Sequence, residues 1–186
     1  MTEFLIPGEG VLFMKVGTHA DEDLSDIIER KKREIDDAGF AMWGYGGNTC
    51  HPRTMVQPFA RAHRETTGPI RLCMQPMDSK HFAEQIRAEE YSADGASWLP
   101  IPEEINVLGS RYALCIRGLH EVDESLALAT TRVAIGNSKG KPGDEYIRGR
   151  VDKACLEVVG GGDPGEEVGI GLVAEIVEPY AVFLRN

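Results

Sequence analysis

The sequence predicts an α+β domain in which strands outnumber helices. One long amphipathic helix, over about residues 20–38, is the only extended helical pattern in the first third of the chain. Most of the remainder consists of short apolar segments separated by Gly, Pro, Asp and Asn. A chain of 186 residues with 42% hydrophobic residues is long enough to bury one core. We therefore expect a single domain, 1–186, with an antiparallel barrel or sandwich and one or two short helices in the first half.

The first two elements are a buried strand and the long helix. Residues 10–17 form an apolar run with glycine at both ends, which is typical of a buried strand. The acidic residues 21–23 suit the first turn of a helix, and Gly39 favours its end. Residues spaced by three and four define the apolar face of this helix: Leu24, Ile27, Ile28 and Ile35. Lys31 lies on the same face, where its aliphatic stem can pack.

The next third of the chain mixes short strands and helical turns. An aromatic strand is expected over 40–45, and Pro52 favours the start of a helical turn. Pro58 should prevent a long helix, so that a second helix is limited to 59–65. Apolar and polar residues alternate over 70–75, which predicts a strand, whereas residues 82–87 fit helix or strand equally well.

The second half of the chain predicts strands joined by turns. Asp94-Gly95 is a strong hairpin dipeptide between the segments 90–92 and 97–101. The loops 136–143 and 160–165, which are rich in glycine, are expected to be hairpin connections. Further strands are expected over 111–117, 126–135, 146–159 and 168–184.

The segment from Trp43 to Pro52 contains three glycines, two aromatic residues and a Cys-His pair. Free backbone N–H groups in such a turn favour an anion, although the segment fits neither the P-loop pattern nor GxGxxG. Six basic and three acidic residues lie between Asn48 and Arg87, in a protein whose net charge is −10. The alternative is that the glycines only permit a turn and the aromatic rings belong to the core. The predicted ligand-binding residues are Trp43, Tyr45, Gly46, Gly47, Asn48, Thr49, Arg53, Arg61, Lys80 and Trp98.

These features favour a binding protein for a small phosphate-bearing, nucleotide-like ligand, such as a nucleotide second messenger. The alternative from another class is a hydrolase or transferase acting on such a ligand through Cys50, His51 or His63. Adjacent residues seldom point at one another, so a structural role for Cys50 and His51 remains open. We expect no cofactor and no metal, because the His and Cys residues lack the close spacing of metal sites.

The acidic composition restricts the expected partners. A net charge of −10 opposes binding to a nucleic-acid polymer or an anionic membrane, and leaves a protein that engages or inhibits a basic partner protein as a third alternative. The sequence has no apolar run of membrane-spanning length, no signal-peptide pattern and no CxxC motif, which together predict a cytoplasmic protein with reduced thiols. A homodimer, formed through an edge strand such as Tyr180–Arg185, is expected slightly more than a monomer.

Overall fold

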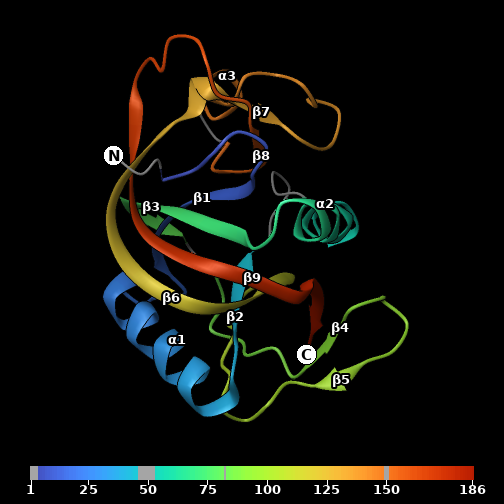
Figure 1. Ribbon diagram of the computed structural model, residues 1–186. Helices are drawn as coiled ribbons and strands as arrows, with labels where there is room; N and C mark the ends of the chain where they lie inside the picture. Colours follow the sequence, from blue (N-terminus) through green and yellow to red (C-terminus); the bar gives the residue numbers. More distant parts are fainter. Residues whose placement is uncertain (1–3, 46–52, 82, 149–150) are drawn as a thin grey trace.

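The computed structural model describes residues 4–45, 53–81, 83–148 and 151–186, and the side chains of all of these except 53–55 and 79–81. Figure 1 shows the arrangement of the helices and strands. In chain order the elements are β1 (Gly10–His19), α1 (Leu24–Ala38), β2 (Ala41–Tyr45), α2 (Arg53–Thr66), β3 (Ile70–His81), β4 (Glu90–Ser92), β5 (Leu99–Pro100), β6 (Tyr112–Ala127), η1 (Leu128–Thr130), β7 (Thr131–Val133), α3 (Gly143–Tyr146), β8 (Lys153–Val158) and β9 (Glu167–Arg185).

The described strands form one mixed sheet with the order β2-β6-β9-β3-β1-β8-β7, and β4 joins β5 to the end of β9. The predicted α+β class and the excess of strands are confirmed. The predicted antiparallel barrel or sandwich is wrong, because β1 and β3 are parallel and the sheet does not close on itself. Parallel neighbours require a crossover connection, and here α1, β2 and α2 provide it.

Alternation along the strands divides the apolar side chains between separate clusters. In β1, Leu12 and Met14 point into a cluster that α1 and α2 cover, whereas Val11 and Phe13 point to the other face. The second cluster lies under β7, β8 and the segment before β1. A third cluster packs the segment 88–107 against β2, β6 and β9. Figure 1 shows β6 and β9 as long curved strands that run through the molecule side by side.

The long helix is confirmed, although it starts at Leu24 and not near residue 20. A tight turn precedes it, in which the backbones of His19 and Glu22 exchange hydrogen bonds and Ala20 has a φ of 49°. Its end at Gly39 follows the prediction, since Gly39 adopts a φ of 87° and donates its N–H to the carbonyl of Ile35.

The second helix runs without a break from Arg53 to Thr66, so the expected limit at Pro58 is wrong. Pro58 is exposed and costs the helix one backbone hydrogen bond. Val56, Phe59 and Ala60 are buried on the opposite side. Each large apolar side chain stabilises the fold by roughly 1.5–3 kcal/mol when it is buried, which offsets the loss at proline.

The second half of the chain follows the prediction in part. The Asp94-Gly95 hairpin is confirmed, with β4 and β5 on either side. The loop 160–165 is not a hairpin connection, because β8 and β9 are not neighbours in the sheet. The segment 126–135 is divided between β6, η1 and β7. Tyr180–Arg185 is not an edge, because β6 pairs along one side of it and β4 along the other.

The start of β1 provides a test of the packing between α2 and the sheet. A Cβ atom on Gly10 would lie 2.5 Å from Cγ of His63, whose ring packs against Phe59. We expect Gly10→Ala to lower the free energy of unfolding by about 1–3 kcal/mol through overpacking. Chemical denaturation measures the change.

Two variants control this test. A Cβ on Gly169, in β9, would have no heavy atom within 4 Å, so Gly169→Ala should be neutral or stabilising. Adding His63→Ala to Gly10→Ala should recover stability relative to the sum of the single changes. Equal losses in Gly10→Ala and Gly169→Ala would contradict the packing argument.

Candidate functional site

A cavity of about 660 Å³, the first cavity, lies where several separate parts of the chain meet. Its walls come from the end of β1, the first half of α1, the end of β2, the segments 83–86 and 106–111, and residues Asp152 and Lys153. The volume falls in the range of small-molecule sites, which is about 300–1,000 Å³.

The apolar part of the wall belongs mainly to the protein core. Met14, Val16 and Ile27 line it together with Trp43 and Tyr45. Trp43 is only 6% exposed and Tyr45 only 5%, and both belong to the cluster beneath α1 and α2. These two rings therefore leave little area for a ligand to stack on.

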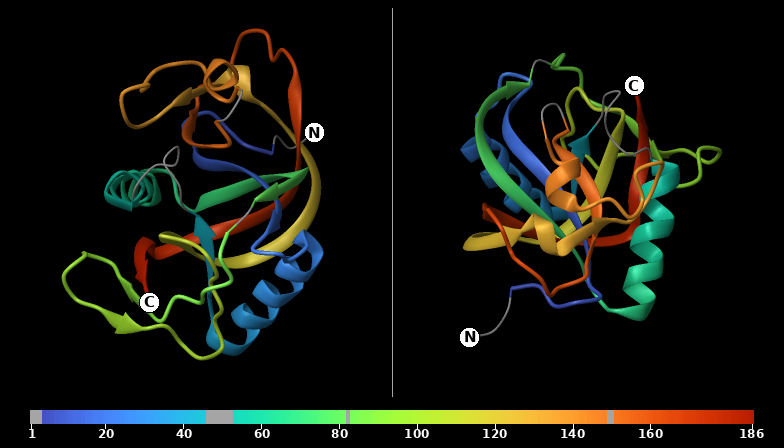
Figure 2. Two further views of the ribbon diagram at one scale, coloured as in Figure 1. Left: turned by 180° about the vertical axis from the view of Figure 1, so that it is seen from behind. Right: turned by 90° about the horizontal axis from the view of Figure 1, so that it is seen from above.

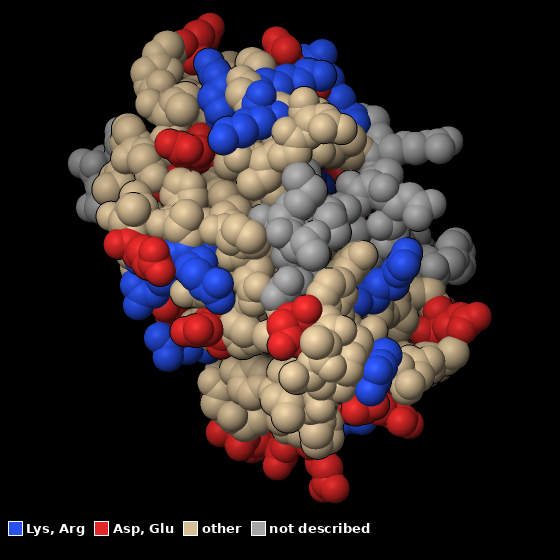
Figure 3. All heavy atoms as spheres, turned by 90° about the vertical axis from the view of Figure 1, so that its right-hand side faces the viewer, with Lys and Arg blue, Asp and Glu red and all other residues tan. Residues whose placement is uncertain are grey.

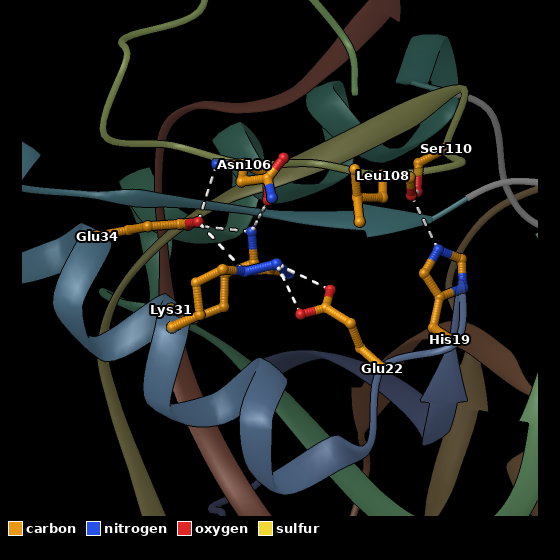
Figure 4. A network of polar contacts seen from close by, with 8 residues as sticks. His19, Glu22, Lys31, Glu34, Asn106, Leu108 and Ser110 are labelled. Carbon is orange, nitrogen blue, oxygen red and sulfur yellow. Dashed lines mark hydrogen bonds and ion pairs between the residues drawn. The ribbon is translucent and has the colours of Figure 1, made fainter. Parts of the chain in front are cut away.

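A buried ion pair fixes one polar wall (Figure 4). Lys31 Nζ donates to Glu34 Oε2 at 3.0 Å and to the backbone carbonyl of Asn106 at 2.8 Å. The backbone N–H of Asn106 donates to the other carboxylate oxygen, Glu34 Oε1, at 2.9 Å. Lys31 and Glu34 are 3% and 2% exposed. The pair thus provides hydrogen-bond partners for both the carbonyl and the N–H of Asn106, and it holds the segment 106–111 against α1.

One further contact holds the same wall, and an ion pair fixes the start of α1 beside it. The Nε2 atom of His19 lies 2.9 Å from the carbonyl oxygen of Leu108, within hydrogen-bonding distance. Arg30 forms an ion pair with Glu22 at 2.8 Å across the turn that precedes α1. Burial lowers the pKa of Lys31 to about 8, against the opposing effect of the Glu34 carboxylate.

The remaining cations in the wall differ in what they contact. Lys153 pairs with Met14 across β8 and β1, so it lies on the cavity side of the sheet, and its Nζ is 2.9 Å from Asp152 Oδ1. Arg111 and Lys15 also lie in the wall, and neither forms an ion pair with another described side chain. Arg111 is exposed, whereas Lys15 is half-buried.

The structure brings together some of the predicted site residues. Trp43 and Tyr45 line the first cavity, and Trp98 lines a second, adjacent one. Arg61 is exposed on α2 and lines neither cavity. The backbone of Arg53 and of Lys80 lies in α2 and β3, but their side chains are outside the description. The residues Gly46, Gly47, Asn48, Thr49, Cys50 and His51 also lie outside the described residues.

The described candidates for catalysis do not meet in the first cavity. His63 lies on α2 with its ring centroid 4.8 Å from that of Phe59, away from both cavities. Cys73, Cys115 and Cys155 are fully buried, and burial raises the pKa of Cys73 and of Cys115 to about 12 and that of Cys155 further. These three thiols are therefore poor nucleophiles. Among the described residues, no group of three His, Cys, Asp or Glu side chains is placed to hold a metal ion.

Sequence reasoning missed most of the polar wall. The spacing places Lys31 on the apolar face of the helix, but nothing local indicates that Glu34 is buried beside it. Asn106, Arg111 and Lys153 come from separate parts of the chain, and only the fold brings them to one cavity. Nothing in their local sequence marks them.

No family model matches the chain, and the comparisons found neither a curated protein nor a solved structure that is detectably similar to it. None of the helices in the described ranges is long and apolar enough to cross a membrane. The assignment of a function therefore depends on the geometry of the cavities.

Replacing Lys31 should destabilise the protein strongly. The change Lys31→Met leaves the buried Glu34 carboxylate without its shortest ion pair. Loss of one member of a buried pair costs about 3–5 kcal/mol, and we expect the free energy of unfolding to fall by this amount in chemical denaturation.

The control is Arg33→Met, an exposed position on the same helix, which should change stability by no more than about 0.5 kcal/mol. Adding Glu34→Gln to Lys31→Met removes the stranded charge and keeps an acceptor for the Asn106 N–H. The double variant should recover part of the loss. A Lys31→Met protein as stable as the unchanged protein would refute the proposed clamp.

The same lysine predicts a pH dependence with a defined sign. Between pH 8 and 10.5, the unfolded chain holds a proton on Lys31 that the folded protein has released, so stability rises with pH. We expect the difference in unfolding free energy between the unchanged protein and Lys31→Met to increase across this window by up to on the order of 1 kcal/mol per pH unit.

The buried thiols have the opposite effect: their pKa is raised in the folded protein, so stability falls with pH once the thiols of the unfolded chain ionise above about pH 9. This contribution is the same in both proteins and cancels in the difference. Denaturation of both proteins at pH 7, 8, 9 and 10 measures the trend. A difference that stays flat or falls over this range would contradict it.

Proposed function

We propose that the protein binds a small anionic, nucleotide-like ligand in the first cavity. The observation that carries this proposal is Arg111, a guanidinium in the wall of a cavity of about 660 Å³ that has no ion pair with another described residue. Guanidinium groups suit phosphate because their planar N–H donors can bind two of its oxygens at once.

The charges of the wall separate into those already paired and those available to a ligand. Arg30 and Lys31 are neutralised by Glu22 and Glu34, and Lys153 by its neighbour Asp152. Arg111 remains, opposed by the exposed carboxylate of Glu84. Lys15 alternates with Met14 along β1, so its side chain points to the other face of the sheet. This balance favours one anionic group of modest charge rather than a polyanion.

The glycine-rich segment is connected to this site. Tyr45 is the last residue of β2 and lines the first cavity, and residue 46 follows it in the chain. We propose that the backbone N–H groups of residues 46–49 contribute to binding the anion, as the sequence predicts. Arg53 and Lys80 stay part of the proposal as additional sources of charge.

Binding without turnover is the function that the described residues favour. The hydrolase or transferase alternative now rests on Cys50 and His51, because His63 is away from the cavities. The alternative of an acidic partner-binding surface gains no support from the face in Figure 3, on which basic and acidic side chains both occur. Neither alternative has a supporting contact among the described residues.

The proposal predicts a specific effect of Arg111. A thermal-shift screen of mononucleotides, dinucleotides and cyclic dinucleotides should identify compounds that raise the melting temperature. Calorimetry should then show that Arg111→Ala weakens the best of them by about tenfold to a hundredfold, which corresponds to a charge-assisted hydrogen bond of about 1.5–3 kcal/mol. Arg33→Ala, on the exposed side of α1, is the matched charge control and should bind normally.

A screen in which no compound stabilises the protein would count against the proposed function. The same conclusion would follow if Arg111→Ala and Arg33→Ala bound the best compound equally well.

A further inference from the structure

A second cavity, of about 670 Å³, adjoins the first. Ser110, Arg111 and Asn186 line both of them, so the two cavities meet at a shared wall. Arg111 therefore lies at the junction, within reach of ligand groups on either side. Ser110, Arg111 and Asn186 all lie in the part of the chain that the structure describes.

Three aromatic rings line the second cavity. Trp98, Tyr112 and Phe183 line it, and the rings of Tyr112 and Phe183 pack at 5.9 Å between centroids. Tyr112 also packs against Tyr45 at 5.4 Å. A row of rings thus runs from the wall of the first cavity to that of the second. Tyr112 and Trp98 are each only partly buried, in contrast to Trp43.

Trp98 is held in place before any ligand arrives. The guanidinium of Arg185 lies 4.0 Å from the centroid of its ring, a cation–π contact. Arg185 Nε in turn donates to Glu90 Oε1 at 3.1 Å. Figures 1 and 2 show that the β4–β5 hairpin projects beside the end of β9. The two strands of this hairpin lie on either side of the Asp94 turn. A ring fixed in this way loses little conformational entropy when a ligand packs on it.

We propose that the two cavities are two subsites of one binding site, and that the ligand is an elongated molecule that joins a flat ring to an anionic group. The ring occupies the second cavity beside Trp98 and Tyr112, and the anionic group lies at Arg111. This inference rests on the proposed function and narrows it to nucleoside phosphates, in which a base is linked to a phosphate through a sugar.

Calorimetry with AMP, GMP, CMP, UMP and ribose 5-phosphate tests the inference. The unchanged protein should bind at least one of the four nucleotides about tenfold or more tightly than ribose 5-phosphate, which has the anion without the ring. Trp98→Ala should abolish this preference and leave the affinity for ribose 5-phosphate unchanged. Trp98→Phe should retain part of the preference, because it keeps an aromatic face.

Leu99→Ala is the matched control, since Leu99 lies in the same hairpin, is 55% exposed and lines neither cavity. It should bind like the unchanged protein. If Trp98→Ala keeps the full preference while Arg111→Ala weakens both ligands, the second subsite is refuted and the proposed function stands. If none of the four nucleotides binds, the inference is also overturned. The wider screen of dinucleotides then tests the proposed function separately.

Discussion

The buried pair of Lys31 and Glu34 is the constraint on which the cavity region depends. Two charges less than 4% exposed would be costly if they only neutralised each other. Here each also completes a hydrogen bond with the backbone of Asn106, one to its carbonyl and one from its N–H. The pair therefore completes the backbone hydrogen bonding of Asn106, next to the bridge that joins Leu108 to Arg87, and it fixes the wall that leads to Arg111.

This clamp also determines which charges a ligand can use. Lys31 and Arg30 already form ion pairs with carboxylates. They therefore help to position the wall of the first cavity but do not attract an anionic ligand. Arg111 lies five residues after Asn106 on the clamped segment, just before β6 begins at Tyr112. Its backbone is anchored on the other side as well, since its carbonyl accepts the N–H of Leu184. A guanidinium on a segment held from both sides is better placed to bind an anion than one on a free loop.

The local parts of the fold could be predicted from the sequence, and the long-range parts could not. The apolar spacing of Ile27 and Ile28, the stop at Gly39 and the Asp94-Gly95 turn act over a few residues, and the structure has all three. The continuity of α2 through Pro58 depends on tertiary burial of Phe59 and its neighbours, which a local rule cannot weigh. The parallel pairing of β1 with β3 joins segments about sixty residues apart, and alternation alone does not define such a partner. The same holds for the candidate site. Trp98 is predicted as a ligand-binding residue because it is aromatic, whereas no local pattern indicates Arg111.

The exposure of the aromatic rings decides where a flat group could bind. The sequence favours Trp43 and Tyr45, because they lie beside the glycines, but a ring that is about 5% exposed has almost no face to offer. Stacking stabilises a complex only through the ring area that the ligand covers. Tyr112 and Trp98 retain accessible surface and line a cavity that shares Arg111 with the first. In the proposed arrangement the phosphate therefore lies at Arg111 and the base beside Tyr112 and Trp98, while the buried Trp43 and Tyr45 belong to the core that lines the first cavity.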